Sequence, residues 1–179
     1  MISRAEAIGL LEKAGCAPKV IKHCEAVAAL AVEFAKKIKG TGKEVNIELV
    51  EAGALLHDLG RCRTHGIDHA MEGFNLAKKM GIETRLAEII KRHIGAGISR
   101  EEAKSLGLPD DDYFPRSLEE KIVAHADNLV KGTKRISTEE RLSIMKKKDV
   151  GGEAIKRIMR LAEEIEENCR KGHHEKINK

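Results

Sequence analysis

The chain has 179 residues, enough for one domain with a substantial hydrophobic core. Hydrophobic residues make up 41% and charged residues 35%, a composition typical of a globular protein rather than a disordered one. The net charge of +4 and the 2% aromatic content argue against stable nucleic-acid binding, either through a strongly basic surface or through stacked rings.

Helical signals recur along the whole chain. The capping sequence Ser-x-x-Glu begins at Ser3, Ser99, Ser117 and Ser137, and Pro18 suits the first position of a helix. The expected helices span 3–14, 18–40, 47–59, 68–80, 84–94, 99–106, 117–131, 138–148 and 153–170. No segment carries a persuasive strand pattern, so the sequence predicts an all-α fold.

Nothing in the pattern divides the chain into separate units. We expect a single helical domain over 1–170, followed by a polar and flexible tail over 171–179. The sequence lacks both the apolar core of a secretion signal and the run of ~18 apolar residues that crosses a membrane. The four cysteines are scattered without a CxxC pair, which is typical of reduced thiols in a cytoplasmic protein.

The dipeptide His57-Asp58 is the first candidate for chemistry. It ends an apolar helix, where two ionisable groups are costly to bury without partners. His23 repeats the pattern beside the buried stripe of its helix, and Asp127 does so between Val123 and Val130. Alone, His23 is more simply a satisfied core residue, and the alternative for His57-Asp58 is a helix-terminal pair in solvent. A shared metal ion explains all three inward-facing positions at once.

Two further histidines extend this set. His69 opens a helix and has Gly73 one turn later, whereas His93 ends the helix that carries Ile89 and Ile90. Either could be a surface residue, but beside the stronger candidates both are predicted to bind metal, and a carboxylate such as Asp58 can bridge two ions. The histidine-rich set favours Fe, Mn, Co, Ni or Zn over Mg.

At this point the pattern resembles the H…HD…D signature of the HD-domain superfamily of metal-dependent phosphohydrolases. The segment His57-Asp-Leu-Gly-Arg61, with His69-x-x-x-Gly73 and His93-x-Gly95, is similar to the subgroup with two ions. The layout is closest to bacterial HD-type dinucleoside tetraphosphate hydrolases and small archaeal HD proteins. The resemblance covers roughly residues 18–131 and implies an HD-type helical bundle.

The resemblance also implies roles for single residues. One ion would be held by His23, His57, Asp58 and Asp127, and Asp58 would bridge to a second ion held also by His69 and His93. Several relatives have Lys where Arg61 stands, facing the substrate phosphate. Arginine keeps that charge and adds a bidentate fork, so Asp58 and Arg61 are the predicted catalytic residues.

Other polar residues near the motif are given structural roles. His125 lies two positions before Asp127 and points elsewhere on the helix, so we interpret it as structural. Arg63, Lys91 and Arg92 are plausible phosphate contacts, although a solvated helix surface is their default interpretation.

The function favoured by the sequence is hydrolysis of a phosphate ester or anhydride by a metal-bound hydroxide, with a nucleotide as the expected substrate. Two alternatives stay open. A diiron oxygenase of the HD fold uses a similar His/Asp set, and a nucleotide-sensing module binds without turnover.

Overall fold

The computed structural model describes residues 2–170. The helices are α1 (Arg4–Lys13), α2 (Pro18–Gly40), α3 (Ile47–Leu56), α4 (His69–Lys79), α5 (Thr84–Arg92), α6 (Arg100–Ser105), α7 (Leu118–Asn128), α8 (Thr138–Lys147) and α9 (Gly152–Arg170). A 3₁₀ helix, η1 (Leu59–Cys62), and two short strands, β1 (Val130–Lys131) and β2 (Lys134–Arg135), complete the elements of this range. The all-α prediction is confirmed. The predicted tail, 171–179, lies outside the described residues.

The predicted caps begin four of these helices. The hydroxyls of Ser3, Ser99, Ser117 and Ser137 each accept a hydrogen bond from the backbone N–H three residues later. The N–H groups of Ser3 and Ser99 in turn donate to the carboxylate of the glutamate three residues later, which completes the capping box. These local bonds satisfy backbone groups that a helix end would otherwise leave unpaired.

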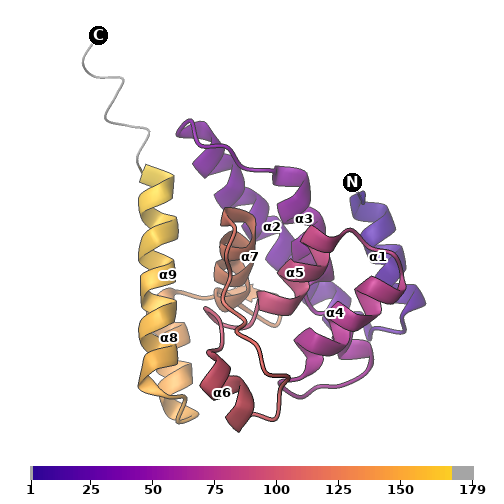
Figure 1. Ribbon diagram of the computed structural model, residues 1–179. Coiled ribbons are helices and arrows are strands. Elements are labelled where there is room, and N and C mark those ends of the chain that lie inside the picture. Colours follow the sequence, from indigo (N-terminus) through magenta and orange to yellow (C-terminus); the bar gives the residue numbers. More distant parts are fainter. Residues whose placement is uncertain (1, 171–179) are drawn as a thin grey trace.

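The core forms around α2 and α3. Along α2 the buried residues recur at helical spacing, from Val20 through Val27 and Phe34 to Ile38. α3 is buried nearly all round, and its C-terminal end therefore lies in the protein interior. α7 packs against both α2 and α3, and α9 lies along the outer side of α7 (Figure 1). This arrangement brings the ends of α3 and α7 together deep in the molecule.

The third helix is shorter than predicted. It ends at Leu56, not at residue 59, and the chain tightens into η1. The reason is a close approach to α4. A Cβ built on Gly60 would lie 1.9 Å from the carbonyl oxygen of His69, so only glycine lets η1 and α4 meet here. The turn brings the residues after Leu56 next to the start of α4.

The helix predicted over 117–131 also ends early, at Asn128, because the next residues form a hairpin that the sequence analysis missed. Val130 pairs with Arg135 and Lys131 pairs with Lys134, in antiparallel register. Gly132 supplies the positive φ of +63° that this two-residue turn requires. The strands are two residues long, too short for an alternating pattern to be visible in the sequence.

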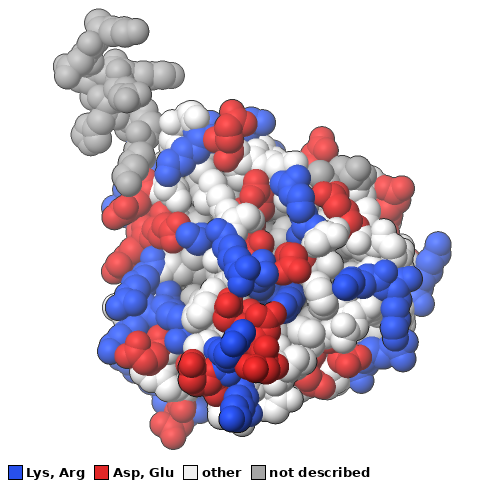
Figure 2. Space-filling view, viewed as in Figure 1, with Lys and Arg blue, Asp and Glu red and all other residues white. Residues whose placement is uncertain are grey.

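Among residues 2–170, no helix is long and apolar enough to cross a membrane. Basic and acidic side chains are interspersed on the face of the molecule shown in Figure 2, where neither sign forms a continuous surface. That mixture agrees with the small net charge of the chain.

Candidate metal centre

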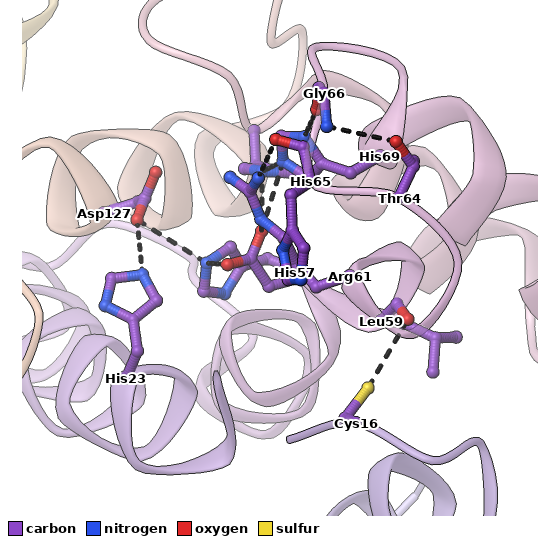
Figure 3. Close-up of polar contacts among 12 residues, drawn as sticks. Cys16, His23, His57, Leu59, Arg61, Thr64, His65, Gly66, His69 and Asp127 are labelled. Atoms are coloured by element: carbon purple, nitrogen blue, oxygen red, sulfur yellow. Dashed lines mark hydrogen bonds and ion pairs between the residues drawn. The ribbon is translucent and has the colours of Figure 1, made fainter. Parts of the chain in front are cut away.

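The six predicted metal ligands come from five separate places in the fold. They are His23 in the first half of α2, His57 and Asp58 between α3 and η1, His69 at the start of α4, His93 directly after α5, and Asp127 near the end of α7. In this His/Asp cluster, the side chains of His23, His57, His69 and Asp127 point toward one another (Figure 3). Oδ1 of Asp58 and Nε2 of His93 lie 3.1 Å and 3.0 Å from Nε2 of His69. The structure therefore brings together all six residues.

Backbone carbonyl oxygens fix the orientation of all four imidazoles. Nδ1 of His57, His69 and His93 lies 2.7–2.8 Å from the carbonyl oxygen three residues earlier. Nδ1 of His23 lies 2.7 Å from the carbonyl oxygen of Gly132, in the hairpin turn. A carbonyl can only accept, so each Nδ1 carries the proton and donates it. In the neutral imidazoles, Nε2 is then an unprotonated acceptor.

These Nε2 atoms face other acceptors. Nε2 of His69 lies 3.0 Å from Nε2 of His93, and Nε2 of His23 lies 3.0 Å from Oδ1 of Asp127. Nε2 of His57 is buried and has no hydrogen-bond partner among the described residues. Neutral lone pairs directed at one another repel unless a proton or a cation lies between them. A cation at the centre of the cluster resolves all of these contacts together.

Asp58 lies between two groups of histidines. Its Oδ1 is 3.1 Å from Nε2 of His69 and 3.6 Å from Nε2 of His93, whereas its Oδ2 is 3.8 Å from Nε2 of His57. The side chain is only 9% exposed. One carboxylate oxygen is thus available to each side of the cluster, as a bridging carboxylate requires.

Arg61 lies at the edge of the cluster. Its Nε donates to Oδ1 of Asp58 at 3.1 Å, and its Nη1 donates to the carbonyl oxygen of His65 at 3.0 Å. The side chain is 27% exposed, so the guanidinium can be reached from solvent while it remains beside Asp58. The position is consistent with the predicted contact to a substrate phosphate.

The cluster also shifts the pKa values of its members. Burial favours the protonated form of Asp58, but His57 and His69 outweigh it and hold the pKa of this carboxyl far below its ordinary value. Burial, together with the neighbouring His57 and His69, lowers the pKa of His93 to about 3. Burial lowers the pKa of His57, but Cys24, Asp58 and Asp127 outweigh it and raise this pKa well above its ordinary value. Asp58 and His93 are thus in the protonation state that binds a metal ion, whereas His57 would release a proton on binding one.

Three overlapping groups of the described residues could each hold an ion, with ligand atoms all within 4.8 Å of one another. They are His23, His57 and Asp58; His57, His93 and Asp127; and Asp58, His69 and His93. The last group matches the predicted second ion. The first contains three of the four residues predicted for the first ion, and the fourth, Asp127, contacts both His23 and His57.

The remaining polar candidates have other partners. Lys91 and Arg92 are each only 9% exposed and form ion pairs with acidic side chains, Asp111 for the lysine and Glu88 and Glu120 for the arginine. Both positive charges are neutralised within the fold, which argues against phosphate binding.

Arg63 and His125 are not among the residues grouped as possible metal ligands. Arg63 is exposed. The ring of His125 packs against Phe34 with the ring centroids 5.0 Å apart. Burial and the nearby Arg135 lower the pKa of His125 to about 4. These contacts suit the structural interpretation of His125.

Sequence reasoning missed the carbonyl groups that orient the histidines. For His57, His69 and His93 the signal was available, because a residue at a helix end or in a tight turn can reach the carbonyl three positions before it. For His23 no local signal exists, because the carbonyl of Gly132 lies 109 residues away in the sequence.

The helical fold and the buried His/Asp cluster are typical of helical proteins that bind metal ions. Comparison with known proteins identifies the family. The family model for the HD domain matches residues 20–132, and the chain belongs to this family. The family match supports a metal-dependent hydrolase of the HD type.

Among the similar proteins is an uncharacterized protein of Methanocaldococcus jannaschii, 50% identical over 84% of this chain and 89% of its own length. A tRNA (cytidine(56)-2'-O)-methyltransferase of Thermoplasma volcanium is 46% identical over 86% of this chain, which spans only 44% of that protein. In a crystal structure with cyclic-di-AMP, the HD domain of the phosphodiesterase PgpH from L. monocytogenes shares the fold. It has a TM-score of 0.54 and 20% identity, covering 86% of this chain and 92% of that one.

Proposed function

We propose that the protein is a metal-dependent phosphohydrolase that cleaves a phosphate ester or anhydride of a nucleotide. The orientation of Asp58 carries the proposal, because its two oxygens face His57 on one side and His69 with His93 on the other. A carboxylate between two sets of imidazole nitrogens is suited to a pair of cations, and paired cations are typical of phosphoryl-transfer sites.

The proposed ligand sets follow the two sides of the cluster. His23, His57, Asp58 and Asp127 would hold one ion, and Asp58, His69 and His93 the other. Four imidazole nitrogens favour Fe, Mn, Co, Ni or Zn over Mg. When bound, such ions supply Lewis acidity toward the phosphate and lower the pKa of a coordinated water.

The protein's own residues position the reaction. The carbonyl bonds of the four histidines hold the free nitrogens in place before any ligand arrives, so little reorganisation is needed on binding. The Arg61 guanidinium is held by the carbonyl oxygen of His65, and its remaining N–H groups can donate to a phosphate oxygen. The positive charge of the same guanidinium can stabilise negative charge that develops on the phosphate in the transition state.

One structural neighbour supports a nucleotide as the substrate, because the PgpH HD domain was crystallised with cyclic-di-AMP. The neighbour shows the fold, and we extend its ligand class to this chain as part of the proposal. Because one relative is named as a tRNA methyltransferase, transfer RNA belongs among the compounds to be tested.

The test is a screen of the protein loaded with Mn²⁺, Fe²⁺ or Co²⁺ in turn. The panel contains cyclic dinucleotides, dinucleoside polyphosphates, nucleoside monophosphates and transfer RNA, with Asp58→Ala as the matched inactive control. We expect release of phosphate or a nucleotide that depends on the metal and on Asp58. Oxygen consumption that depends on ferrous ion would favour the oxygenase instead, and binding without any turnover would favour the sensing module.

A further inference from the structure

We propose that Asn128 is a positioning residue that couples the two halves of the metal centre. It directly follows Asp127, a ligand proposed for the first ion. Its side-chain Nδ2 donates to the carbonyl oxygen of Gly95 at 2.7 Å. Gly95 lies two residues after His93, a ligand proposed for the second ion. The inference rests on the proposed two-ion site and adds a residue that contacts neither ion.

The orientation of the Asn128 amide is determined by its surroundings. If the amide were reversed, Oδ1 would lie 2.7 Å from the Gly95 carbonyl oxygen, and two acceptors would repel. With Nδ2 toward Gly95, Oδ1 is buried and has no partner among the described residues. The residue is 1% exposed, so the unpaired Oδ1 costs free energy. The bond to Gly95 is thus made although the other half of the amide is left without a partner.

The bond is a second link between α7 and the segment at the C-terminal end of α5. Near the start of α7, Glu120 pairs with Arg92 at the end of α5, at 3.3 Å. Near the end of α7, where Asp127 lies, the Asn128 bond holds the loop that follows His93. With both links in place, the end of α5 cannot shift along α7.

The loop that receives the bond is constrained in its backbone. Gly95 has a φ of +61° and Gly97 a φ of +97°, and the N–H of Gly97 donates to the carbonyl oxygen of Ile94 at 3.0 Å. A Cβ built on Gly97 would lie 2.6 Å from the ring of Phe114, so the loop is packed closely on that side. Without Asn128 the carbonyl of Gly95 loses its partner, and the turn can relax away from α7.

Relaxation of this turn changes the spacing between the two ion positions. Nε2 of His93 lies only 3.6 Å from Oδ1 of Asp58, and Asp127 faces His57 on the other side. Metal ligands tolerate displacements of only a few tenths of an ångström, and loss of an outer hydrogen bond typically weakens metal binding 10–100-fold. The second ion should be affected more, because the freed loop is attached to His93.

Asn128→Leu tests the proposal, because leucine has a similar size and lacks the donor. The matched control is Asn168→Leu in α9, another buried asparagine, whose side-chain oxygen accepts a hydrogen bond from Lys43. Metal-free wild type and both variants are titrated with Mn²⁺, with free ion counted by electron paramagnetic resonance. The same spectra report magnetic coupling between paired ions, a signature that a purely structural role of Asn128 would not change.

We expect Asn128→Leu to weaken the second Mn²⁺ at least tenfold and to lose the coupled spectrum, while Asn168→Leu binds both ions as wild type does. A second-ion affinity no weaker than that of the control would overturn the proposal. If wild type binds a single ion, the coupling proposal falls with the two-ion centre. If wild type binds two ions and hydrolyses no substrate, only the proposed function fails, because the readout does not depend on activity.

Discussion

At the scale of single residues, an imidazole can direct either nitrogen toward a metal, and the backbone decides which one is free. In the His/Asp cluster all four histidines use Nδ1 for a carbonyl oxygen and leave Nε2 for the centre. Membership of one cluster could be inferred from the sequence for His23, Asp127 and the His57-Asp58 dipeptide, because each lies beside apolar residues at helical spacing or at the end of an apolar helix. His69 and His93 lack that context and were predicted only because the stronger candidates indicated a metal site. The tautomers could not be inferred, since the partner of His23 is remote in the chain.

Asp58→Ala should abolish hydrolysis and weaken both ions, because each of its oxygens faces a different group of histidines. The helical content should remain, because Asp58 follows the end of α3 and contributes no apolar packing. Metal analysis, circular dichroism and a hydrolysis assay give the three readouts. Asp110→Ala is the control, because Asp110 is an exposed carboxylate that pairs with Arg100 at 3.4 Å. Full turnover by Asp58→Ala at normal metal content would contradict a bridging role.

His125 provides a prediction about pH. Its folded-state pKa is lowered from 6.5 to about 4, mainly by burial, so the unfolded chain binds the proton more tightly. The resulting stability is present above pH 6.5 and is lost as the pH falls from 6.5 toward 4. Between pH 7.5 and pH 5 the loss amounts to about 2 kcal/mol.

His125→Phe keeps a ring against Phe34 and removes the titrating group. Denaturant unfolding of metal-free protein at pH 7.5 and pH 5 measures the effect. The variant should lose about 2 kcal/mol less than wild type on acidification. An equal loss in both proteins would show that His125 does not titrate differently in the folded state.

At the scale of elements, the hairpin of β1 and β2 reaches into the centre although it is short. The carbonyl oxygen of Gly132 receives the Nδ1 proton of His23, so the turn sets the direction of that ligand. The capped helices were predictable from local signals, whereas this hairpin and the early end of α3 were not. Both depend on contacts with distant segments, such as the approach of Gly60 to His69, that no local pattern encodes.

Substitution of Gly132 tests the role of this turn. A Cβ at Gly132 meets no atom within 4 Å, so any effect comes from the backbone φ of +63°. Gly132→Val should disturb the turn and weaken the ion bound by His23 about tenfold, because β-branched residues avoid this conformation. Gly132→Asn should bind metal nearly as wild type does, since asparagine tolerates it. Calorimetric titration with Co²⁺ measures the metal affinity of each variant. Equal affinities of Gly132→Val and Gly132→Asn would contradict a role of the turn in orienting His23.

At the scale of the whole molecule, the centre gathers side chains from the ends or the middle of five segments distributed over most of the chain. Ions bound there connect α2, α4, α5 and α7 to the buried end of α3, so they should stabilise the folded state as a whole. At a free ion concentration 100-fold above Kd, each site contributes about 2.7 kcal/mol. For a chain of this length the melting temperature should rise by roughly 5–10 °C per site.

Differential scanning fluorimetry with and without Mn²⁺ measures this shift, and EDTA should reverse it. The same titration of Asp58→Ala supplies the control, with a much smaller shift expected. A wild-type melting temperature that does not respond to any of the favoured metals would argue against a metal centre built across the fold.

The central claim is that two ions in the His/Asp cluster are needed for phosphate hydrolysis. Its most direct test is a titration of metal-free protein with Mn²⁺ in which bound ions per chain and the hydrolysis of bis(p-nitrophenyl) phosphate are followed together. We predict no turnover without metal, a steep rise as occupancy passes one, and saturation at about two ions per chain. His93→Ala should saturate near one ion with little activity. Turnover by the metal-free protein, or none with both ions bound, would contradict the account.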